Sequence, residues 1–146
     1  MAEAIIRKAG RDAPAFNVLG ETINVLASAV DTGSYEMFLE SVPLDGGPPP
    51  HFHPWDESFY LVSGELEYVI DGKPGVAIAG AFVHLPAGTV HSYTSKADPS
   101  VMIAVTSRAG ASALFVDLDA ASAEAPPTME RVVEVANAHQ VTAIVA

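Results

Sequence analysis

The chain lacks cysteine entirely, and this absence excludes disulfide bonds, thiolate metal ligands and cysteine nucleophiles. Long apolar runs are also missing, because no stretch approaches the roughly 20 apolar residues that a membrane-spanning helix needs. The N-terminus has no long apolar segment behind a basic start, so no signal peptide is evident. We therefore expect no membrane association and predict a cytoplasmic location.

Basic residues are scarce. Lysine and arginine together number 7, against 18 aspartate and glutamate residues, and the formal net charge is -11. A chain of this charge is repelled by phosphate backbones and by anionic membrane surfaces. The few basic residues are scattered and form no patch with interleaved aromatic residues. We predict no nucleic-acid partner and attribute the charge to solubility.

Short strands dominate the pattern that remains. Hydrophobic residues make up 49% of the chain, which is enough for a substantial core. Turn signals such as Ser63-Gly64 and Asp71-Gly72 recur at spacings of roughly eight to twelve residues, which is typical of a β-sandwich or barrel. The expected strands lie within residues 21–30, 35–42, 58–72 (two strands), 81–85 and 101–107.

Three histidines and one glutamate are spaced as a single metal site. Successive side chains on a strand point to opposite faces, so His51 and His53 share a face, with Cα atoms about 6–7 Å apart. Two imidazoles at this spacing can converge on one ion. A local turn brings Glu57 to the same side, and His91 must come from a different strand. Each histidine taken alone is more commonly a core or surface residue; the joint spacing indicates the metal site.

These residues resemble the two sequence motifs of the cupin superfamily. The first motif is matched by Gly46, His51, His53, Glu57 and Gly64, and the second by Gly80, Pro86, Gly88 and His91. The spacer after Gly46 has four residues where five are usual, and Ser95 stands where the second motif prefers asparagine. Neither position is a ligand in the family.

The resemblance implies a mainly β protein with the cupin double-stranded β-helix (jelly-roll) barrel. We expect the barrel and its N-terminal strands to occupy residues 1–110. Residues 111–146 are expected to form a short two-helix tail packed on the same single domain. The helices are predicted over residues 111–118 and from Met129 to about His139, with Thr128 as the cap of the second. This tail resembles, in a loose match, that of quercetin-dioxygenase-like cupins.

The family ligand set, carried onto this chain, is His51, His53, Glu57 and His91. Three imidazoles and a carboxylate suit one divalent transition metal (Fe, Mn, Ni, Co or Zn) and do not suit Cu(I) or an iron–sulfur cluster. Four protein ligands leave coordination positions open, which is the feature of a catalytic site. The identity of the metal is left open.

The predicted function is that of a metal-dependent, dioxygenase-type enzyme acting on a small organic substrate with an enolisable or phenolic oxygen. Glu57 is predicted either to ligate the metal or to act as the base that takes the substrate proton. The alternatives are a non-redox isomerase, cyclase or lyase, a non-catalytic small-molecule-binding cupin, and a stress or storage protein without a substrate. The fold alone does not decide among them.

Strand parity suggests which other side chains reach the pocket. Positions of the same parity as the two ligand histidines are expected to face inward. Within residues 35–42, either the set that contains Met37 or the alternate set lines the barrel. The pocket candidates are Trp55, Phe59, Tyr68, His84 and Met37, each with ordinary packing as the alternative, and for His84 an outward-facing position.

The resemblance also implies a homodimer. The apolar segments Val25–Val30 and Val141–Ala146 need cover. That cover comes either from a second copy or from within the same chain.

Overall fold

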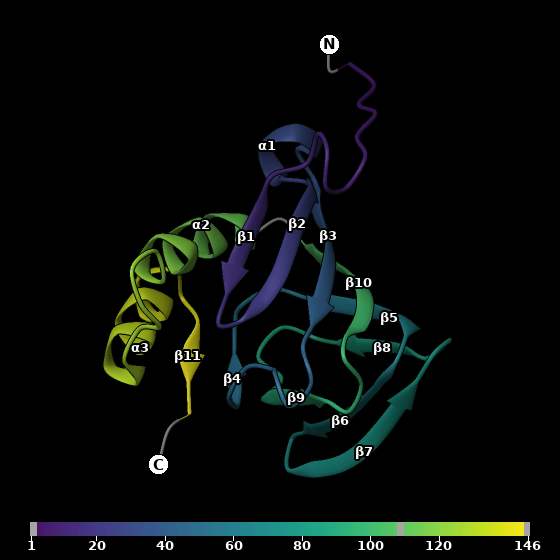
Figure 1. Ribbon diagram of the computed structural model, residues 1–146, viewed down its shortest axis with the longest axis vertical. Coiled ribbons are helices and arrows are strands. Elements are labelled where there is room, and N and C mark those ends of the chain that lie inside the picture. Colours follow the sequence, from purple (N-terminus) through teal and green to yellow (C-terminus); the bar gives the residue numbers. More distant parts are fainter. Residues whose placement is uncertain (1–2, 108–109, 145–146) are drawn as a thin grey trace.

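The computed structural model describes residues 3–107 and 110–144. Two antiparallel sheets face each other, and two helices lie together at one side, beside the first and last strands (Figure 1). From β3 to β10 the chain passes back and forth between the two sheets. This arrangement confirms the predicted jelly-roll barrel with two helices after it.

The larger sheet has six strands. Their order is β1 (Ala15–Val18), β2 (Glu21–Ala27), β3 (Tyr35–Val42), β10 (Ser100–Ser107), β5 (Glu57–Ser63) and β8 (Phe82–Leu85). The smaller sheet has five, in the order β11 (Thr142–Ala143), β4 (His51–Phe52), β9 (His91–Ser95), β6 (Glu65–Ile70) and β7 (Lys73–Ile78).

Alternation along the strands forms the core between the sheets. On β3 the buried side chains are Glu36, Phe38, Glu40 and Val42. Met37 therefore lies on the opposite face of the strand, and its prediction as a pocket residue is wrong. The residues of β3 alternate equally regularly on its two faces, so periodicity did not distinguish them. Because two of the inward-facing residues are acids, polarity did not reveal the buried face either.

One predicted strand ends early. Residues 21–30 were expected to be continuous, but β2 stops at Ala27 and a single helical turn, α1 (Ala29–Thr32), follows. Ser28 caps this turn, because its side chain accepts a hydrogen bond from Asp31 N–H while the Asp31 carboxylate accepts one from Ser28 N–H. Local capping thus overrides the apolar pattern.

Strand β7 was not predicted, and it contains Pro74 and Gly75, two residues that are rare within strands. It lies at the edge of the smaller sheet, where proline is tolerated. Gly75 leaves room for the ring of Tyr68, because a Cβ there would stand 2.3 Å from Cζ of that ring. The ring of Tyr68 thus covers the glycine.

The two long helices are α2 (Ala111–Ala121) and α3 (Met129–Ala138). Thr128 caps α3 as predicted, accepting a hydrogen bond from the Arg131 N–H. The buried face of α3 comprises Val132, Val135 and Ala136, whereas Met129, the first residue of the helix, is half exposed. Within the described ranges, no helix has the length and apolarity needed to cross a membrane. The domain division at residue 110 stays a prediction.

Candidate metal centre

A tight loop delivers the chain to the first histidine. Gly47 has φ +143°, and a Cβ at this position would lie 1.9 Å from the backbone oxygen of Tyr93. Only glycine fits this approach. The prolines that follow lead into β4, which pairs with β9 so that His51 stands directly opposite His91. The two histidines come from distant parts of the sequence but occupy one position across the sheet.

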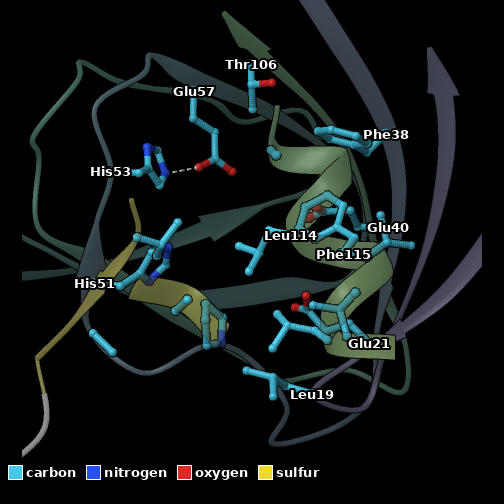
Figure 2. A pocket seen from close by; sticks show the side chains of 18 of the residues that line it. Leu19, Glu21, Phe38, Glu40, His51, His53, Glu57, Thr106, Leu114 and Phe115 are labelled. Carbon is cyan, nitrogen blue, oxygen red and sulfur yellow. Dashed lines mark hydrogen bonds and ion pairs between the residues drawn. The ribbon is translucent and has the colours of Figure 1, made fainter. Parts of the chain in front are cut away.

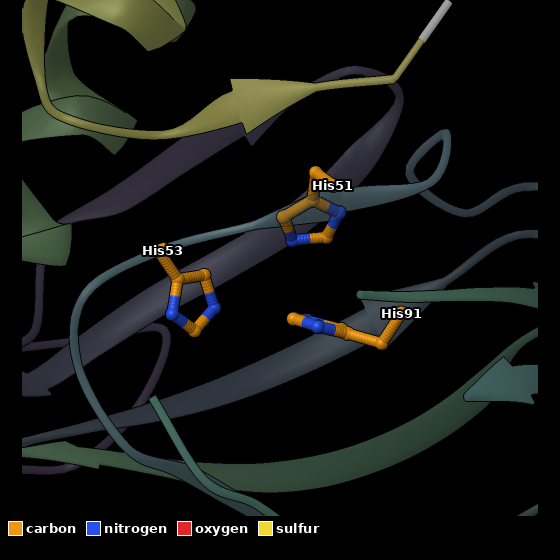
Figure 3. Close-up of side chains that lie close together, drawn as sticks. All are labelled: His51, His53 and His91. Carbon is orange, nitrogen blue, oxygen red and sulfur yellow. The ribbon is translucent and has the colours of Figure 1, made fainter. Parts of the chain in front are cut away.

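The third histidine, His53, lies just beyond the end of β4, and its ring turns toward the same point. One ring nitrogen from each of His51, His53 and His91 lies within 4.8 Å of the others. Figure 3 shows the three rings facing a common centre. His53 and His91 are buried and His51 is half-buried.

The other nitrogen of each ring is occupied by the backbone. Nδ1 of His51 lies 2.9 Å from Pro49 O, Nδ1 of His53 lies 3.0 Å from Trp55 O, and Nδ1 of His91 lies 2.9 Å from Thr89 O. Because a carbonyl oxygen accepts a hydrogen bond, each Nδ1 carries the hydrogen. Each Nε2 then keeps its lone pair for a ligand, and hydrogen bonds of this kind orient metal-binding histidines in proteins.

Glu57, the first residue of β5, completes the cluster from the opposite sheet. Its Oε2 lies 2.9 Å from His53 Nε2 and 3.4 Å from His91 Nε2. Burial raises the pKa of Glu57, but the hydrogen bonds and charges of His53 and His91 outweigh it and hold the pKa well below its usual range. The carboxylate is therefore ionised at neutral pH.

The pKa values of two of the histidines are shifted in opposite directions. Burial and the neighbouring His91 lower the pKa of His51 to about 4, so its ring is neutral at pH 7. For His91 burial also lowers the pKa, but the hydrogen bond and charge of Glu57 outweigh it and leave the pKa raised. Neutral imidazoles and one carboxylate fit a divalent transition metal.

A cavity of about 110 Å³ opens beside these residues, inside the barrel. All four predicted ligands line it. Most of the remaining wall is apolar and comes from both sheets and from α2 and α3, including Ile23, Phe38, Leu114, Phe115 and Val132. Figure 2 shows Leu114 and Phe115 of α2 directed toward the cavity from the side away from His51 and His53. The tail helices are thus part of the wall.

Of the remaining residues predicted to line the pocket, some do so and others do not. Trp55 lines the cavity and is stacked on His53, with ring centroids 4.5 Å apart. Phe59 and Tyr68 face the interior of the barrel but lie outside the cavity lining. His84 is exposed and hydrogen-bonds to Ser58 Oγ at 2.7 Å, so its prediction as a pocket residue is wrong. It alternates with buried Leu85 and therefore faces outward.

Four polar residues of the cavity wall were not predicted: Glu21, Glu40, Tyr93 and Thr106. The Tyr93 hydroxyl donates a hydrogen bond to Glu21 Oε1 at 2.7 Å. Glu40 Oε2 and Thr106 Oγ1 are buried and have no hydrogen-bond partner within the described residues. For Glu40 the sequence signal was the alternation of β3, which did not distinguish between the two sets of residues on that strand.

Comparison with known proteins agrees with this architecture. A family model described as "Cupin domain" matches residues 38–106. Quercetin 2,3-dioxygenase of Bacillus subtilis (strain 168) is 29% identical over 100 residues, which cover 65% of this chain and 29% of that protein. This chain therefore spans less than a third of the length of that curated relative.

Solved structures share the fold at low sequence identity. An RmlC-like cupin from Shewanella frigidimarina has a TM-score of 0.63 and 18% identity, covering 75% of this chain and 96% of that one. The polyketide cyclase RemF from Streptomyces resistomycificus has a TM-score of 0.62 and 20% identity, covering 71% and 80%. KdgF from Halomonas sp. has a TM-score of 0.61 and 20% identity, covering 68% and 89%. The family model thus identifies a cupin domain over residues 38–106, and these structures show that the chain shares the cupin fold.

Proposed function

We propose that this protein is a metal-dependent enzyme of the dioxygenase type that acts on a small organic substrate. The observation that carries the proposal is the convergence of three imidazoles, each with Nδ1 bound to a backbone carbonyl, on one wall of a buried apolar cavity. The 29% identity to quercetin 2,3-dioxygenase supports the oxygenase class.

In this proposal His51, His53 and His91 hold the ion through Nε2, and Glu57 holds it through its carboxylate. When bound, a divalent ion supplies Lewis acidity and, if it is a redox metal, a route to O₂ chemistry. The ionised Glu57 suits the role of ligand. Its second role, as the base that takes the substrate proton, requires it to give up its contacts with His53 and His91.

The cavity limits the size and polarity of the substrate. An apolar cavity of about 150 Å³ holds one benzene molecule, and the volume here is about 110 Å³. A compact substrate fits this scale, with an enolisable or phenolic oxygen directed at the histidines and its apolar part against Phe38 and Leu114. The apolar wall also excludes water from the reacting group.

Metal analysis followed by O₂-uptake assays tests the proposal. Protein purified without added metal and without a histidine tag is expected to contain close to one Fe, Mn, Ni or Co ion per chain. Compact phenols and enols are then screened for O₂ consumption. Protein that takes up no metal under any reconstitution condition contradicts the metalloenzyme assignment.

The donor set accepts zinc as readily as a redox metal, and this favours a second candidate function. A chain that carries zinc alone and consumes no O₂ belongs to the non-redox class of isomerases, cyclases or lyases. Saturable ligand binding without turnover identifies a non-catalytic binding protein. Metal identity and O₂ uptake therefore separate the three.

The proposed assembly is a cytoplasmic homodimer. Val141 and Val25 are buried in their own chain, whereas Leu26 to Ala29 are half-buried and Val30 is exposed. A different surface suits a second copy: the cross-strand pair Tyr60 and Phe82 is exposed on β5 and β8, with Val62 and Ile78 nearby in the chain. Light scattering of the wild type and of Phe82→Glu tests this, with a monomeric wild type as the contradicting result.

A further inference from the structure

Two glutamates on the same face of β3 have opposite surroundings. Glu36 is fully buried and satisfied: its carboxylate accepts hydrogen bonds from Ala29 N–H at 2.9 Å and Ser112 N–H at 3.0 Å, and from the Ser112 hydroxyl. It joins the starts of α1 and α2. Glu40, four residues along, is 4% exposed, and its Oε2 has no partner among the described residues.

A buried carboxyl without a partner lowers the stability of the fold, because it loses its hydration and gains nothing in return. Glu36 shows how a structural carboxyl on this strand is accommodated. Glu40 lacks any such role, and its side chain lines the cavity. Its position therefore indicates that its hydrogen-bond partner is supplied by a molecule bound in the cavity.

A second carboxyl stands beside Glu40. Glu21 on β2 is two residues from Ile23, the residue opposite Glu40 in the sheet, so Glu21 and Glu40 occupy diagonal positions on one face. Tyr93 from the facing sheet donates its hydroxyl hydrogen to Glu21 Oε1. Both carboxyls line the cavity, and Figure 2 shows them on the side away from His51 and His53.

We propose that Glu40 and Glu21 form a second binding point in the cavity, which receives a neutral hydroxyl group at the end of the substrate remote from the metal. The proposal deepens the proposed function and rests on it in one respect, because the bound molecule is a substrate only if the protein is the proposed enzyme. The binding point itself is a property of the cavity and requires no metal.

The protonation of Glu40 favours a hydroxyl over an ammonium group. Burial, reinforced by the charges of Glu21 and Glu57, raises the pKa of Glu40 well above its usual value, which favours the neutral acid. A neutral acid both donates and accepts hydrogen bonds, as a hydroxyl does. An ammonium ion would lose its hydration in a mainly apolar cavity while facing an uncharged acid.

Matched single-ring probes test this in the metal-free protein. Phenol, toluene and benzylamine are titrated into chelator-treated protein and followed by ¹H–¹⁵N NMR, using wild type, Glu40→Leu and Glu40→Gln. Glu67→Gln is the control, because Glu67 is an exposed glutamate on a strand, outside the cavity lining. Omitting the metal prevents phenol from binding as its oxyanion to the ion.

We expect wild type and Glu67→Gln to bind phenol at least about tenfold more tightly than toluene, which corresponds to one good hydrogen bond. Glu40→Leu is expected to lose this preference and to show a Tm several degrees higher, since the unpartnered carboxyl is gone. Glu40→Gln, which can still donate and accept, is expected to retain most of the preference.

The proposal is overturned if phenol does not bind, if Glu40→Leu keeps the phenol preference, or if benzylamine binds more tightly than phenol. If Glu40→Leu does not fold, Glu40→Gln and Glu21→Leu provide the comparison. Metal content and O₂ uptake are measured separately on the same proteins. The phenol-binding result can therefore be interpreted even if the metal proposal fails, and the metal result can be interpreted even if phenol does not bind.

Discussion

Nε2 of His53 lies 2.9 Å from Oε2 of Glu57, although the first residue follows a strand of the smaller sheet and the second begins a strand of the larger one. The pair thus joins the two sheets at the place where we propose that a metal binds.

Replacing His51 or His91 with alanine is expected to abolish stoichiometric metal binding. Each variant removes one of four ligands, so the affinity should fall by at least about 100-fold, beyond the roughly 10–100-fold loss caused by removing outer hydrogen-bond partners. Elemental analysis of the purified proteins measures this. His84→Ala is the matched control, because His84 is exposed and outside the cavity. Full metal content in His51→Ala would contradict the assignment.

Glu57→Gln tests how much the negative charge of the fourth proposed ligand contributes, independently of the size of the side chain. The amide keeps the size of the side chain but loses the negative charge, so metal affinity is expected to fall by about 10–100-fold and turnover to fall with it. Competition with a coloured chelator gives the affinity. A variant that retains its metal and full turnover would exclude Glu57 as ligand and as base.

Glu21 makes the stability of the metal-free protein depend on pH. Burial raises its pKa to about 7 from the usual 4.5, while Tyr93 opposes this and Glu57 adds to it. The groups that face it are Tyr93 from β9, Glu40 from β3 and Glu57 from β5. The native state binds more protons than the unfolded state between pH 4.5 and about 7, so stability is lost as the pH rises through this range.

Glu21→Gln removes this loss. We expect the variant to gain on the wild type as the pH rises from 4.5 to about 7, by a few kcal/mol at most, and to show a constant difference above that. Urea denaturation at a series of pH values measures the free energy of unfolding. A difference that is independent of pH, or one that grows as the pH falls, would contradict the prediction.

Adjacent positions on β5 test the assignment of faces. Leu61 is fully buried, whereas Val62 is 46% exposed. Leu61→Ala is expected to lower the free energy of unfolding by about 2–5 kcal/mol, because it removes buried methyl groups and leaves a cavity. Val62→Ala should change it by less than about 0.5 kcal/mol. Equal effects in urea denaturation would contradict the inward orientation of Leu61.

The histidine cluster was recognisable from sequence because its chemistry and spacing are local. The separation of His51 and His53 by one residue puts them on one side of the chain, and the turn residues around His91 mark the start of another strand. The tail helices were also predictable, since Thr128 and the apolar spacing that follows it act within a few residues. Strand β7 was missed because Pro74 and Gly75 are acceptable only at an edge that the sequence does not reveal.

The other polar residues of the cavity wall could not be identified from local sequence patterns. Alternation along β3 identified two sets, but the choice between Met37 and Glu40 depended on which face met the other sheet. Glu21 and Tyr93 are 72 residues apart and belong to different sheets, so no local pattern joins them. Sequence by itself determined which residues are the candidate metal ligands, because that chemistry resides in side chains and short spacings. Tertiary structure alone decided which acids are buried in the cavity, because burial depends on register and on how the sheets pack.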